Sequence, residues 1–576
     1  MSGTPLIFIC TCYETLSRTI PRGVLRTGIV ARRPNAHIEF VPSLCRREDI
    51  DLIAGLIKER KHASVLLAAC SPFARGNVVL DGLARRNPAM QASLVDVREG
   101  CAWVHGGNPD AAAAKAVDLV CMGLAGLRCR EHSSEFHFQP VRRVLVVGAG
   151  PAGLAAAGTL ARLGIEVSLA ERMSRPGGLL NQIGRLFPYN MPGREFLATF
   201  LSEASHPCVD LLPKTSVTRI EGDPGRFEAH LSLEGRDMTV TAGAVILACG
   251  AMPVLPQNRF HSGELSGVIS QLELETRLNK LEREESAPAG IAGAVFIQCV
   301  DAREDARPYC STICCPTALK NALRLKNLNR DISVTVLHRG IMTPGRDLEE
   351  LYRQTMASGV RFVAFSPASP PEVHGDGFVS SVSLTDALSA RRLEIAADLV
   401  VLSTPLKPRP ETASLAGDLG LRLDEIGFAC GTEPMQPLVA PTPGVYLCGA
   451  VRWPVSAQEA VDQGRAAAIK AAGFLAQGAL DLNRLFLPGS RRGPASIRTE
   501  ACSRCGRCVS GCPYGACRRE KNGPVTVCGI RCRGCGLCVA VCPSGAVRIP
   551  EQDSASVRAM LREIAPRPTA LREVHR

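Results

Sequence analysis

The sequence has few aromatic residues and no long apolar segment. Phe, Trp and Tyr make up 4% of the 576 residues, and Trp occurs twice. The longest uncharged stretch, Met238–Asn258, contains two glycines and two prolines. It is typical of strands and turns, so we expect no transmembrane segment. Residues Met1–Tyr13 lack the basic and apolar regions of a secretion signal, so we expect a cytoplasmic, reducing environment.

The chain has a globular composition and many cysteines. Hydrophobic residues account for 46% and charged residues for 21%, which excludes a disordered chain. The length predicts about four domains. The 25 cysteines, in a chain without a secretion signal, favour metal binding over disulfide bonds.

Changes of pattern along the chain predict its domains. Apolar strands such as Leu6–Cys10 and Ser64–Ala69 alternate with helical stretches such as Arg47–Glu59 and Asp110–Gly126, which predicts an α/β domain. The expected divisions are an N-terminal α/β domain at 1–138, a larger α/β region at 139–476 with a second subdomain at 288–400, a linker at 477–492, a cysteine-rich domain at 493–550, and a tail at 551–576 with one helix, Ser554–Ile564.

The cysteine-rich domain contains one internal repeat, C-x2-C-x2-C-x3-C-P. In two-cluster ferredoxins this spacing takes three thiolates from one copy and the fourth from the other. The predicted [4Fe–4S] ligands are Cys502, Cys505, Cys508 and Cys542 for one cluster, and Cys532, Cys535, Cys538 and Cys512 for the other. Zinc knuckles are the alternative, but eight cysteines with both prolines in register argue against them. Cys517 and Cys528 lie outside the pattern and are interpreted as not involved.

A dinucleotide-binding fingerprint follows the N-terminal domain. The apolar strand Val144–Val147 leads into Gly148-Ala-Gly150-Pro-Ala-Gly153 and an Ala-rich helix. A second strand, Glu166–Ala170, ends at Glu171. The glycines let the backbone approach a pyrophosphate at the helix N-terminus, and the acid can accept a hydrogen bond from a ribose hydroxyl.

Two later segments favour FAD over NAD. Val245–Gly250 and Gly444–Ala450, the latter followed by the helix Ala457–Leu475, resemble late segments of two-dinucleotide-domain flavoproteins of the thioredoxin-reductase type. That family often has Gly-Asp where this chain has Gly449-Ala450. The sequence therefore does not decide whether this position contacts the ribityl chain of FAD. The candidate FAD-binding residues are Gly148, Gly150, Gly153, Glu171, Gly178, Gln182, Gly250, Gly449 and Ala450.

The second glycine loop, which such flavoproteins use for NAD(P)H, is absent from the middle of the chain. The strands Gly293–Ile297 and Ile332–His338 and the helix Pro316–Lys326 keep the βαβ frame. A long loop with four cysteines replaces the glycines: Cys299, Cys310, Cys314 and Cys315. Because a helix N-terminus favours anions, we infer a third [4Fe–4S] cluster here, with unpaired buried cysteines as the alternative. Lys320 follows on the same helix, either near the cluster face or as an ordinary surface lysine.

These motifs resemble the A-type subunit of heterodisulfide reductase, an iron–sulfur flavoprotein, over essentially the whole chain. The most specific elements are Gln298-Cys299, Arg303-Glu-Asp, Pro308-Tyr-Cys310-Ser, Cys314-Cys315 and Ala318-Leu-Lys320-Asn321. The resemblance implies a central cluster beside FAD and a catalytic lysine at position 320 that approaches the reactive flavin nitrogen. It also implies an FAD that splits electron pairs between partners.

The N-terminal region also resembles that family, through Cys10-Thr-Cys12, Ala69-Cys70-Ser71-Pro72 and Arg98-Glu-Gly-Cys101-Ala-Trp103-Val-His105. The irregular spacing of its cysteines, Cys45 included, favours core packing over metal binding.

Two features depart from the family. Its archaeal members carry an inserted ferredoxin domain, for which the segment between Phe187 and Phe296 supplies no ligands, and the spacing from Cys299 to Cys310 is slightly short. The sequence therefore predicts a smaller form of this family, with fewer routes by which electrons leave the protein.

The charge balance points to protein partners. The net charge is +12 with thiols counted as neutral. Three clusters and one FAD would offset about eight of these charges, so nucleic acid is not favoured. Arginines around the ferredoxin cysteines predict a partner subunit or an acidic electron carrier such as ferredoxin: Arg504, Arg507, Arg518, Arg519, Arg531 and Arg533. The sequence also allows the chain to form a homodimer.

Three functions fit the sequence. The favoured one is an FAD and [4Fe–4S] electron-transferring oxidoreductase subunit of a heterodisulfide-reductase-like complex, with a partner subunit that cleaves any disulfide. The alternatives are a self-sufficient NAD(P)H-dependent, ferredoxin-linked oxidoreductase and a non-catalytic iron–sulfur scaffold. The terminal electron donor and acceptor stay open.

Overall fold

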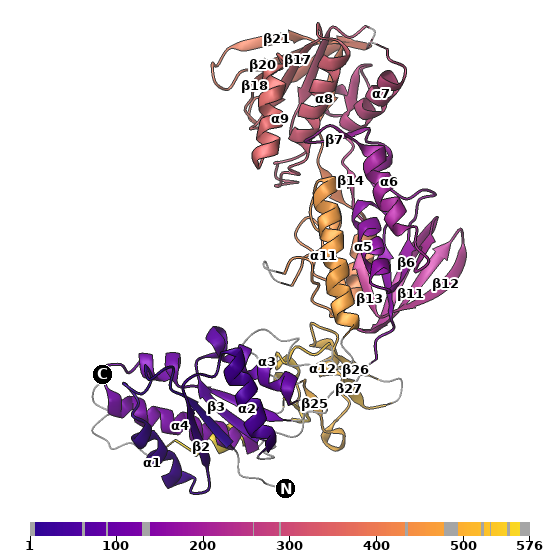
Figure 1. Ribbon diagram of the computed structural model, residues 1–576. Coiled ribbons are helices and arrows are strands. Elements are labelled where there is room, and N and C mark those ends of the chain that lie inside the picture. Colours follow the sequence, from indigo (N-terminus) through magenta and orange to yellow (C-terminus); the bar gives the residue numbers. More distant parts are fainter. Residues whose placement is uncertain are drawn as a thin grey trace. The chain divides into compact units, whose positions relative to one another are not determined.

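The computed structural model describes residues 6–59, 64–87, 90–128, 139–256, 258–286, 288, 290–432, 436–476, 494–519, 523–529, 531–549 and 553–564. The chain divides into two compact units, one made of residues 1–137 and 479–576 and the other of residues 138–478 (Figure 1). The expected linker at 477–492 lies outside the described residues.

The N-terminal part of the first unit is a parallel sheet in the order β2-β1-β3-β4. Successive side chains of a strand point to opposite faces of the sheet. In β1, Leu6 and Phe8 therefore pack against α2 and α3 on one face. Ile7 and Ile9 pack against α1 and α4 on the other face. The elements are β1 (Leu6–Cys10), α1 (Arg22–Arg32), β2 (His37–Val41), α2 (Arg47–Glu59), β3 (Ser64–Ala69), α3 (Asn77–Arg86), β4 (Gln91–Asp96) and α4 (Pro109–Arg128).

The cysteine-rich part of the first unit folds as two similar halves. The short helices α12 (Arg507–Ser510) and α13 (Leu537–Ala540) start thirty residues apart, and each follows a glycine of positive φ, Gly506 and Gly536. Two antiparallel pairs complete it: β25 (Ser496–Ile497) with β28 (Val547–Arg548), and β26 (Cys517–Arg519) with β27 (Val525–Val527). The sequence repeat is therefore also a structural repeat.

The expected helix of the tail packs against the N-terminal sheet domain. Helix α14 (Ser554–Leu561) is capped by Asp553, whose carboxylate accepts a hydrogen bond from the Ser556 N–H at 2.8 Å. It lies against α4, and Arg32 donates to the Glu563 carbonyl at 2.8 Å. Arg33 pairs with the Glu563 carboxylate. The segment after residue 552 thus belongs to the folded unit as far as Ile564.

The second unit begins with a parallel five-stranded sheet in the order β24-β13-β5-β6-β9. Helices α5 and α11 pack against each other beside it, and the antiparallel strands β10, β11 and β12 form a separate sheet. The elements are β5 (Arg143–Val147), α5 (Pro151–Arg162), β6 (Glu166–Ala170), β7 (Arg185–Leu186), β8 (Met191–Pro192), α6 (Gly193–Ala204), β9 (Val209–Leu212), β10 (Thr215–Asp223), β11 (Arg226–Leu233), β12 (Arg236–Ala242), β13 (Ala244–Leu247), α10 (Glu411–Leu419), β24 (Val445–Leu447) and α11 (Ala457–Leu475).

A second parallel sheet, β15-β22-β16-β17-β18, forms the other subdomain of this unit. It starts before residue 288, where the sequence placed its boundary, because β15 pairs in parallel with β22. The elements are β15 (Val268–Ser270), α7 (Gln271–Arg283), β16 (Gly293–Ile297), α8 (Cys314–Leu328), β17 (Ser333–His338), α9 (Arg346–Ala357), β18 (Arg361–Ala364), β19 (Glu372–Asp376), β20 (Phe378–Thr385), β21 (Arg392–Ala396) and β22 (Leu399–Leu402).

Two chain crossings connect the subdomains. They run antiparallel as β14 (Ala251–Pro253) and β23 (Leu406–Pro408). Capping boxes fix the starts of two nearby helices: Ser270 with Glu273 at α7, and Ser456 with Glu459 at α11. The capping boxes therefore define the residues at which α7 and α11 begin.

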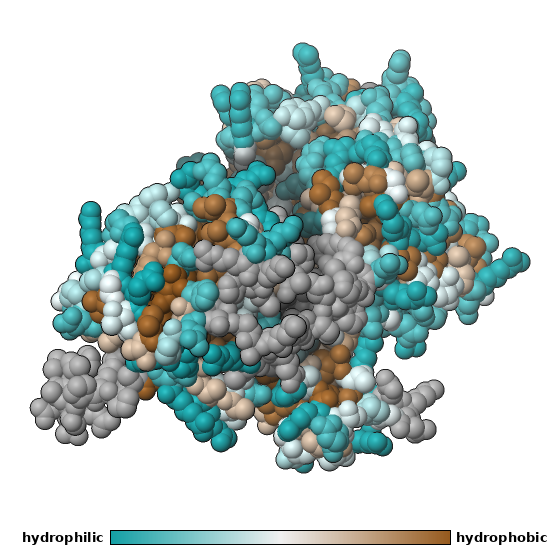
Figure 2. Space-filling model, turned by 60° about the horizontal axis from the view of Figure 1, so that its bottom comes forward, coloured by the Kyte–Doolittle hydropathy of each residue, from teal (hydrophilic) through white to brown (hydrophobic). Residues whose placement is uncertain are grey.

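Hydrophilic side chains project over much of the face seen in Figure 2, where hydrophobic residues form separate patches. Within the described ranges, no helix is both long and apolar enough to cross a bilayer.

Candidate functional site

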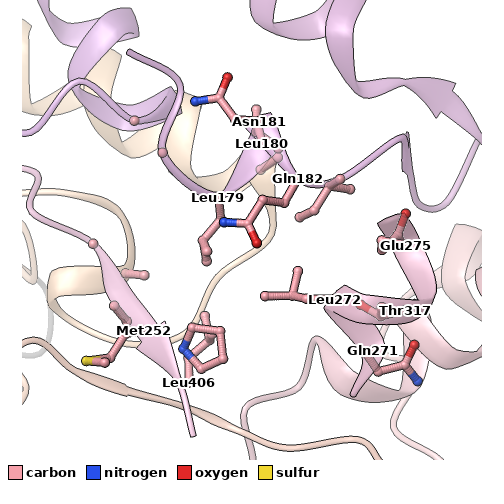
Figure 3. A pocket seen from close by; sticks show the side chains of 18 of the residues that line it. Leu179, Leu180, Asn181, Gln182, Met252, Gln271, Leu272, Glu275, Thr317 and Leu406 are labelled. Atoms are coloured by element: carbon pink, nitrogen blue, oxygen red, sulfur yellow. The ribbon is translucent and has the colours of Figure 1, made fainter. Parts of the chain in front are cut away.

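A cavity of about 2120 Å³ lies in the second unit and is lined by residues of both subdomains. Its walls include the ends of β5, β6 and β13 and the starts of α5, α7, α8 and α11. In Figure 3, Gln182 and Leu272 extend toward one another from opposite sides of this space. Eight of the nine candidate FAD residues line the cavity: Gly148, Gly150, Glu171, Gly178, Gln182, Gly250, Gly449 and Ala450.

The three glycines of the first loop have different surroundings. Gly148 has φ of 103°, a conformation that favours glycine. A Cβ on Gly153 would stand 1.8 Å from the Gly148 carbonyl oxygen, so this position serves close packing of helix and strand. A Cβ on Gly150 would meet no atom within 4 Å. Gly150 therefore borders free space in the cavity, where a bound pyrophosphate fits.

Glu171 holds the glycine loop in place. Its side chain is buried, and its two carboxylate oxygens accept hydrogen bonds from the Ala149 and Met173 N–H groups, each at 2.8 Å. The segment before Gln182 lies against the same loop, since the Gly177 N–H donates to the Ala149 carbonyl at 2.7 Å. A carboxylate has further lone pairs, so Glu171 can also accept from a ribose hydroxyl.

The late segments close the other side of the cavity. Gly250 and Gly449 have φ of 71° and 68°. The Gly449 N–H donates to Oε1 of Gln463 on α11 at 3.0 Å. Ala450 follows and has no side-chain oxygen, so a ribityl chain finds no carboxylate at this position.

The loop that replaces the second glycine motif runs from Gln298 to Ile313 and is strained. Cys299, Asp301, Arg303 and Thr312 have φ between 56° and 60°, although none is glycine. Two side chains from outside the loop hold this conformation: Arg259 donates to Asp301 and Glu304, and Arg339 donates to the Ala302 and Arg303 carbonyls. Within the loop, the Ser311 hydroxyl accepts from the Leu406 N–H.

The four loop cysteines gather at the start of α8. Burial raises the pKa of Cys314 and of Cys315, the latter to about 11, and the neighbouring thiols Cys299 and Cys310 raise both further. Burial also raises the pKa of Cys299, against the opposing effect of Arg303 and Arg339. These arginines place positive charge where four thiolates and a metal cluster would carry negative charge, so the residues present fit an anionic cluster.

Lys320 is buried, which excludes its interpretation as a surface lysine. It is 3% exposed, lines the cavity, pairs with Glu275 of α7 and donates to the Arg185 carbonyl at 2.8 Å. Burial lowers its pKa to about 8, despite the nearby Glu275 carboxylate. Its charge is therefore present near neutral pH and easily lost above it.

A second buried cation shares the same carboxylate. Arg324, one turn after Lys320, donates to Glu275 and Glu282, each at 2.7 Å, and to Asn279 at 2.8 Å. The Gly184 N–H also donates to Glu275 at 3.3 Å. Sequence reasoning missed this cluster, because its members come from separate segments.

The eight repeat cysteines lie together in the first unit. Cys508, Cys532 and Cys538 are buried, and Cys505 and Cys535 are exposed. Cys517, interpreted from the sequence as not involved, belongs to the same buried core. Within the described residues, no three or more Cys, His, Asp or Glu side chains are grouped so that they could hold a metal ion, and this applies to the repeat as well as to the central loop.

The N-terminal cysteines have mixed environments. Cys70 and Cys101 are buried, in agreement with core packing, whereas Cys45 is exposed. Burial raises the pKa of Cys10 to about 11, against the opposing effect of a hydrogen bond from the Cys12 backbone, and the nearby Cys70 thiol adds to the rise.

Two family models match the chain. Residues 142–464 match the pyridine nucleotide-disulphide oxidoreductase family, and residues 501–547 match the 4Fe-4S dicluster domain. The first match covers more than half of the chain, which therefore belongs to the pyridine nucleotide-disulphide oxidoreductase family. The protein is an oxidoreductase with an FAD-binding domain and an iron–sulfur domain.

Among curated proteins the chain is similar to the A-type subunits of heterodisulfide reductases. It is 27% identical to that of the ferredoxin:CoB-CoM heterodisulfide reductase of Methanosarcina mazei, over 88% of this chain and 74% of that protein. It is 26% identical to the corresponding iron-sulfur subunit of the CoB–CoM heterodisulfide reductase of Methanocaldococcus jannaschii, over 90% and 91%. The resemblance seen in the sequence is confirmed.

Among solved structures, thioredoxin reductase from T. acidophilum is 20% identical and matches 58% of this chain and 99% of its own, with a TM-score of 0.42. The family matches and the two observed sheets confirm the expected fold class, a two-dinucleotide-domain α/β flavoprotein with a C-terminal ferredoxin domain.

We expect Gly150→Ala to weaken FAD binding and Gly153→Ala to lower the stability of the apoprotein. The Gly150 Cβ meets no protein atom, so the melting temperature of the apoprotein should be unchanged while FAD binds about tenfold or more weakly, a loss of ~1.4 kcal/mol. The Gly153 Cβ collides with the Gly148 carbonyl, so the apoprotein itself should melt earlier. Calorimetry and FAD titration measure the two effects.

Gly473→Ala is the matched control, because its Cβ also meets no atom within 4 Å and the residue does not line the cavity. Equal FAD affinities for Gly150→Ala and Gly473→Ala would contradict the assignment of Gly150 to the pyrophosphate.

Proposed function

We propose that this chain is the flavin-containing electron-transfer subunit of a heterodisulfide-reductase-like complex. One observation carries the proposal: the cavity bordered by the FAD fingerprint is also lined by Cys314 and Lys320, at the place where a nucleotide-binding glycine loop would stand. Bound FAD supplies conversion between two-electron and one-electron transfer, and iron–sulfur clusters supply one-electron transfer.

The chain's own residues would hold these groups in the following way. The candidate FAD residues that line the cavity would bind the flavin cofactor, with Gly153 keeping helix α5 close to β5. Cys299, Cys310, Cys314 and Cys315 would bind a central [4Fe–4S] cluster. The Thr312 N–H donates to the Cys310 sulfur at 3.3 Å. Together with the eight repeat cysteines this gives three clusters.

Lys320 is the proposed catalytic residue. Its ammonium group lines the cavity and is held between Glu275 and the Arg185 carbonyl. A positive charge at the reactive edge of the flavin stabilises the anionic reduced form. Because Arg324 also binds Glu275, the carboxylate keeps a cationic partner when the Lys320 charge acts on the flavin.

Further subunits would complete the reaction. The M. mazei relative is named for ferredoxin and the CoB-CoM heterodisulfide, and we transfer to this chain only the general role of passing electrons between a carrier and a partner subunit. The arginines of the ferredoxin domain favour an acidic carrier. NAD(P)H-dependent catalysis is the second candidate, which the family name suggests and the loop at 298–313 opposes.

Anaerobic reconstitution should give one FAD and about twelve iron atoms per chain, four for each [4Fe–4S] cluster. Cys315→Ser should remove about four irons and leave the FAD content unchanged, because Cys315 is a ligand of the central cluster alone. Iron and flavin assays measure both. The same change at Cys121, which is buried in the first unit, is the control. About eight irons in the unmodified protein would remove the central cluster from the proposal.

Neither NADH nor NADPH should reduce the flavin of the isolated chain, since the loop at 298–313 offers no glycine-lined cradle for a pyrophosphate. Reduced ferredoxin should bleach the flavin absorbance under the same anaerobic conditions. Rapid bleaching by either nicotinamide would instead support the NAD(P)H-dependent alternative.

Lys320→Met should lower the midpoint potential of the flavin, because it removes a positive charge that stabilises the reduced form by about 1 kcal/mol after screening. Since the pKa of Lys320 is lowered to about 8, its charge is present below that pH and lost above it. The difference between wild type and variant should therefore shrink as the pH rises through about 8. Spectroscopic redox titration measures it.

Lys280→Met is the matched control, because Lys280 lies on α7 with a side chain 70% exposed. Lys326 serves less well, since its ammonium donates to the Arg330 and Ile332 carbonyls at the end of α8. Identical titrations for wild type and Lys320→Met, with equal iron and FAD contents, would rule out a catalytic role.

A further inference from the structure

Gln298 is a buried glutamine whose side-chain amide has no partner among the described residues. The residue is 1% exposed, and both its Nε2 and its Oε1 are buried without a hydrogen bond. A buried amide that makes no hydrogen bond costs free energy of folding, so this group calls for an explanation. Gln298 directly precedes Cys299, the first cysteine of the central loop.

Another buried amide of the same subdomain shows the contrasting case. Gln271 stands at the start of α7 and lines the cavity. Its Nε2 donates to the Ser403 hydroxyl at 2.9 Å, and its Oε1 accepts from the Asn321 amide at 2.8 Å. The Asn321 oxygen has no partner among the described residues, and no hydrogen bond joins it to Gln298. Both ends of the Gln271 side chain are therefore used within the protein, whereas those of Gln298 are not.

The Gln298 side chain lies on the face of the sheet that α7 and α8 cover. Its backbone N–H donates to the Leu337 carbonyl at 2.9 Å, so the pairing of β16 with β17 continues through this residue. Side chains alternate along a strand. Ala294 and Phe296 of β16 belong to a core cluster that also contains Ala318 of α8. Gln298 therefore continues the row that Ala294 and Phe296 begin.

This row leads to the first turn of α8. The helix runs back along the sheet between the parallel strands β16 and β17. Two residues beyond Phe296 advance the strand by about 6.6 Å. Cys314, four residues before Ala318, stands about 6 Å back along the helix. The Gln298 amide therefore lies at the level of Cys314 and Cys315, two of the proposed ligands of the central cluster.

We propose that the Gln298 amide donates a hydrogen bond to a sulfur of the central cluster and raises the reduction potential of that cluster. Hydrogen bonds to the sulfurs of an iron–sulfur cluster are among the factors that set its potential. A donor stabilises the more negative, reduced state more than the oxidised state. The inference rests on the central cluster of the proposed function, to which it adds a residue that sets how readily this cluster accepts an electron.

The test uses the full chain with its cofactors. Gln298→Met removes the amide and keeps an unbranched side chain of similar length. Gln354→Met is the matched control, because Gln354 lies on α9 of the same subdomain with an exposed side chain that donates to Glu350. Electron paramagnetic resonance during redox titration measures the midpoint potentials, and the signal that is missing from Cys315→Ser identifies the central cluster.

Gln298→Met should lower the midpoint potential of the central cluster alone and keep the full iron content, whereas Gln354→Met should leave every potential unchanged. In the Cys315→Ser chain, which lacks the central cluster, the further change Gln298→Met should leave the melting temperature unchanged or raise it, because the amide has no partner there. A marked fall in that melting temperature would overturn the inference, since the amide would then have a partner in the protein.

If Gln298→Met does not fold, the unmodified chain decides the question. After isotopic labelling of the glutamine side-chain nitrogens, pulsed electron paramagnetic resonance should detect a labelled nitrogen coupled to the reduced central cluster. The absence of this coupling, or an unchanged potential in Gln298→Met, would overturn the inference and leave the proposed function intact. About eight irons in the unmodified chain would remove the central cluster, and the inference with it.

Discussion

The geometry of the cavity depends on one buried carboxylate. Glu275 of α7 is 1% exposed and binds Lys320 and Arg324, both from α8, and also the Gly184 N–H of the other subdomain. Removing a partner from a buried charge costs several kcal/mol, so these four groups keep one arrangement. Since α8 begins with two of the loop cysteines, the same contacts fix where the proposed cluster lies relative to the proposed flavin.

The strained loop stands where a nucleotide-binding frame of this kind would have a glycine turn. Strand β16, helix α8 and strand β17 keep the parallel βαβ geometry, and the change is confined to residues 298–313. A glycine turn brings backbone N–H groups to a phosphate. This loop instead carries thiols and Arg303, and Arg339 donates to the loop from the end of β17. The helix N-terminus favours an anion in both cases.

Motifs whose local geometry is determined by the spacing of their residues could be predicted from the sequence. The glycine loop, the repeat cysteines and the bounds of α11 fall where the pattern placed them, because local spacing determines them. The Glu275 cluster could not be found in this way, since its members meet only after two subdomains have folded.

The docking of α14 on α4 has a consequence for biosynthesis. Arg32 and Glu563, which form a hydrogen bond in the first unit, are separated by 531 residues of sequence. The ribosome therefore releases the whole of the second unit before the last helix of the first unit exists. Until then the surface of α4 that α14 covers stays open to solvent, so the first unit is the last to be completed although its sheet is made first.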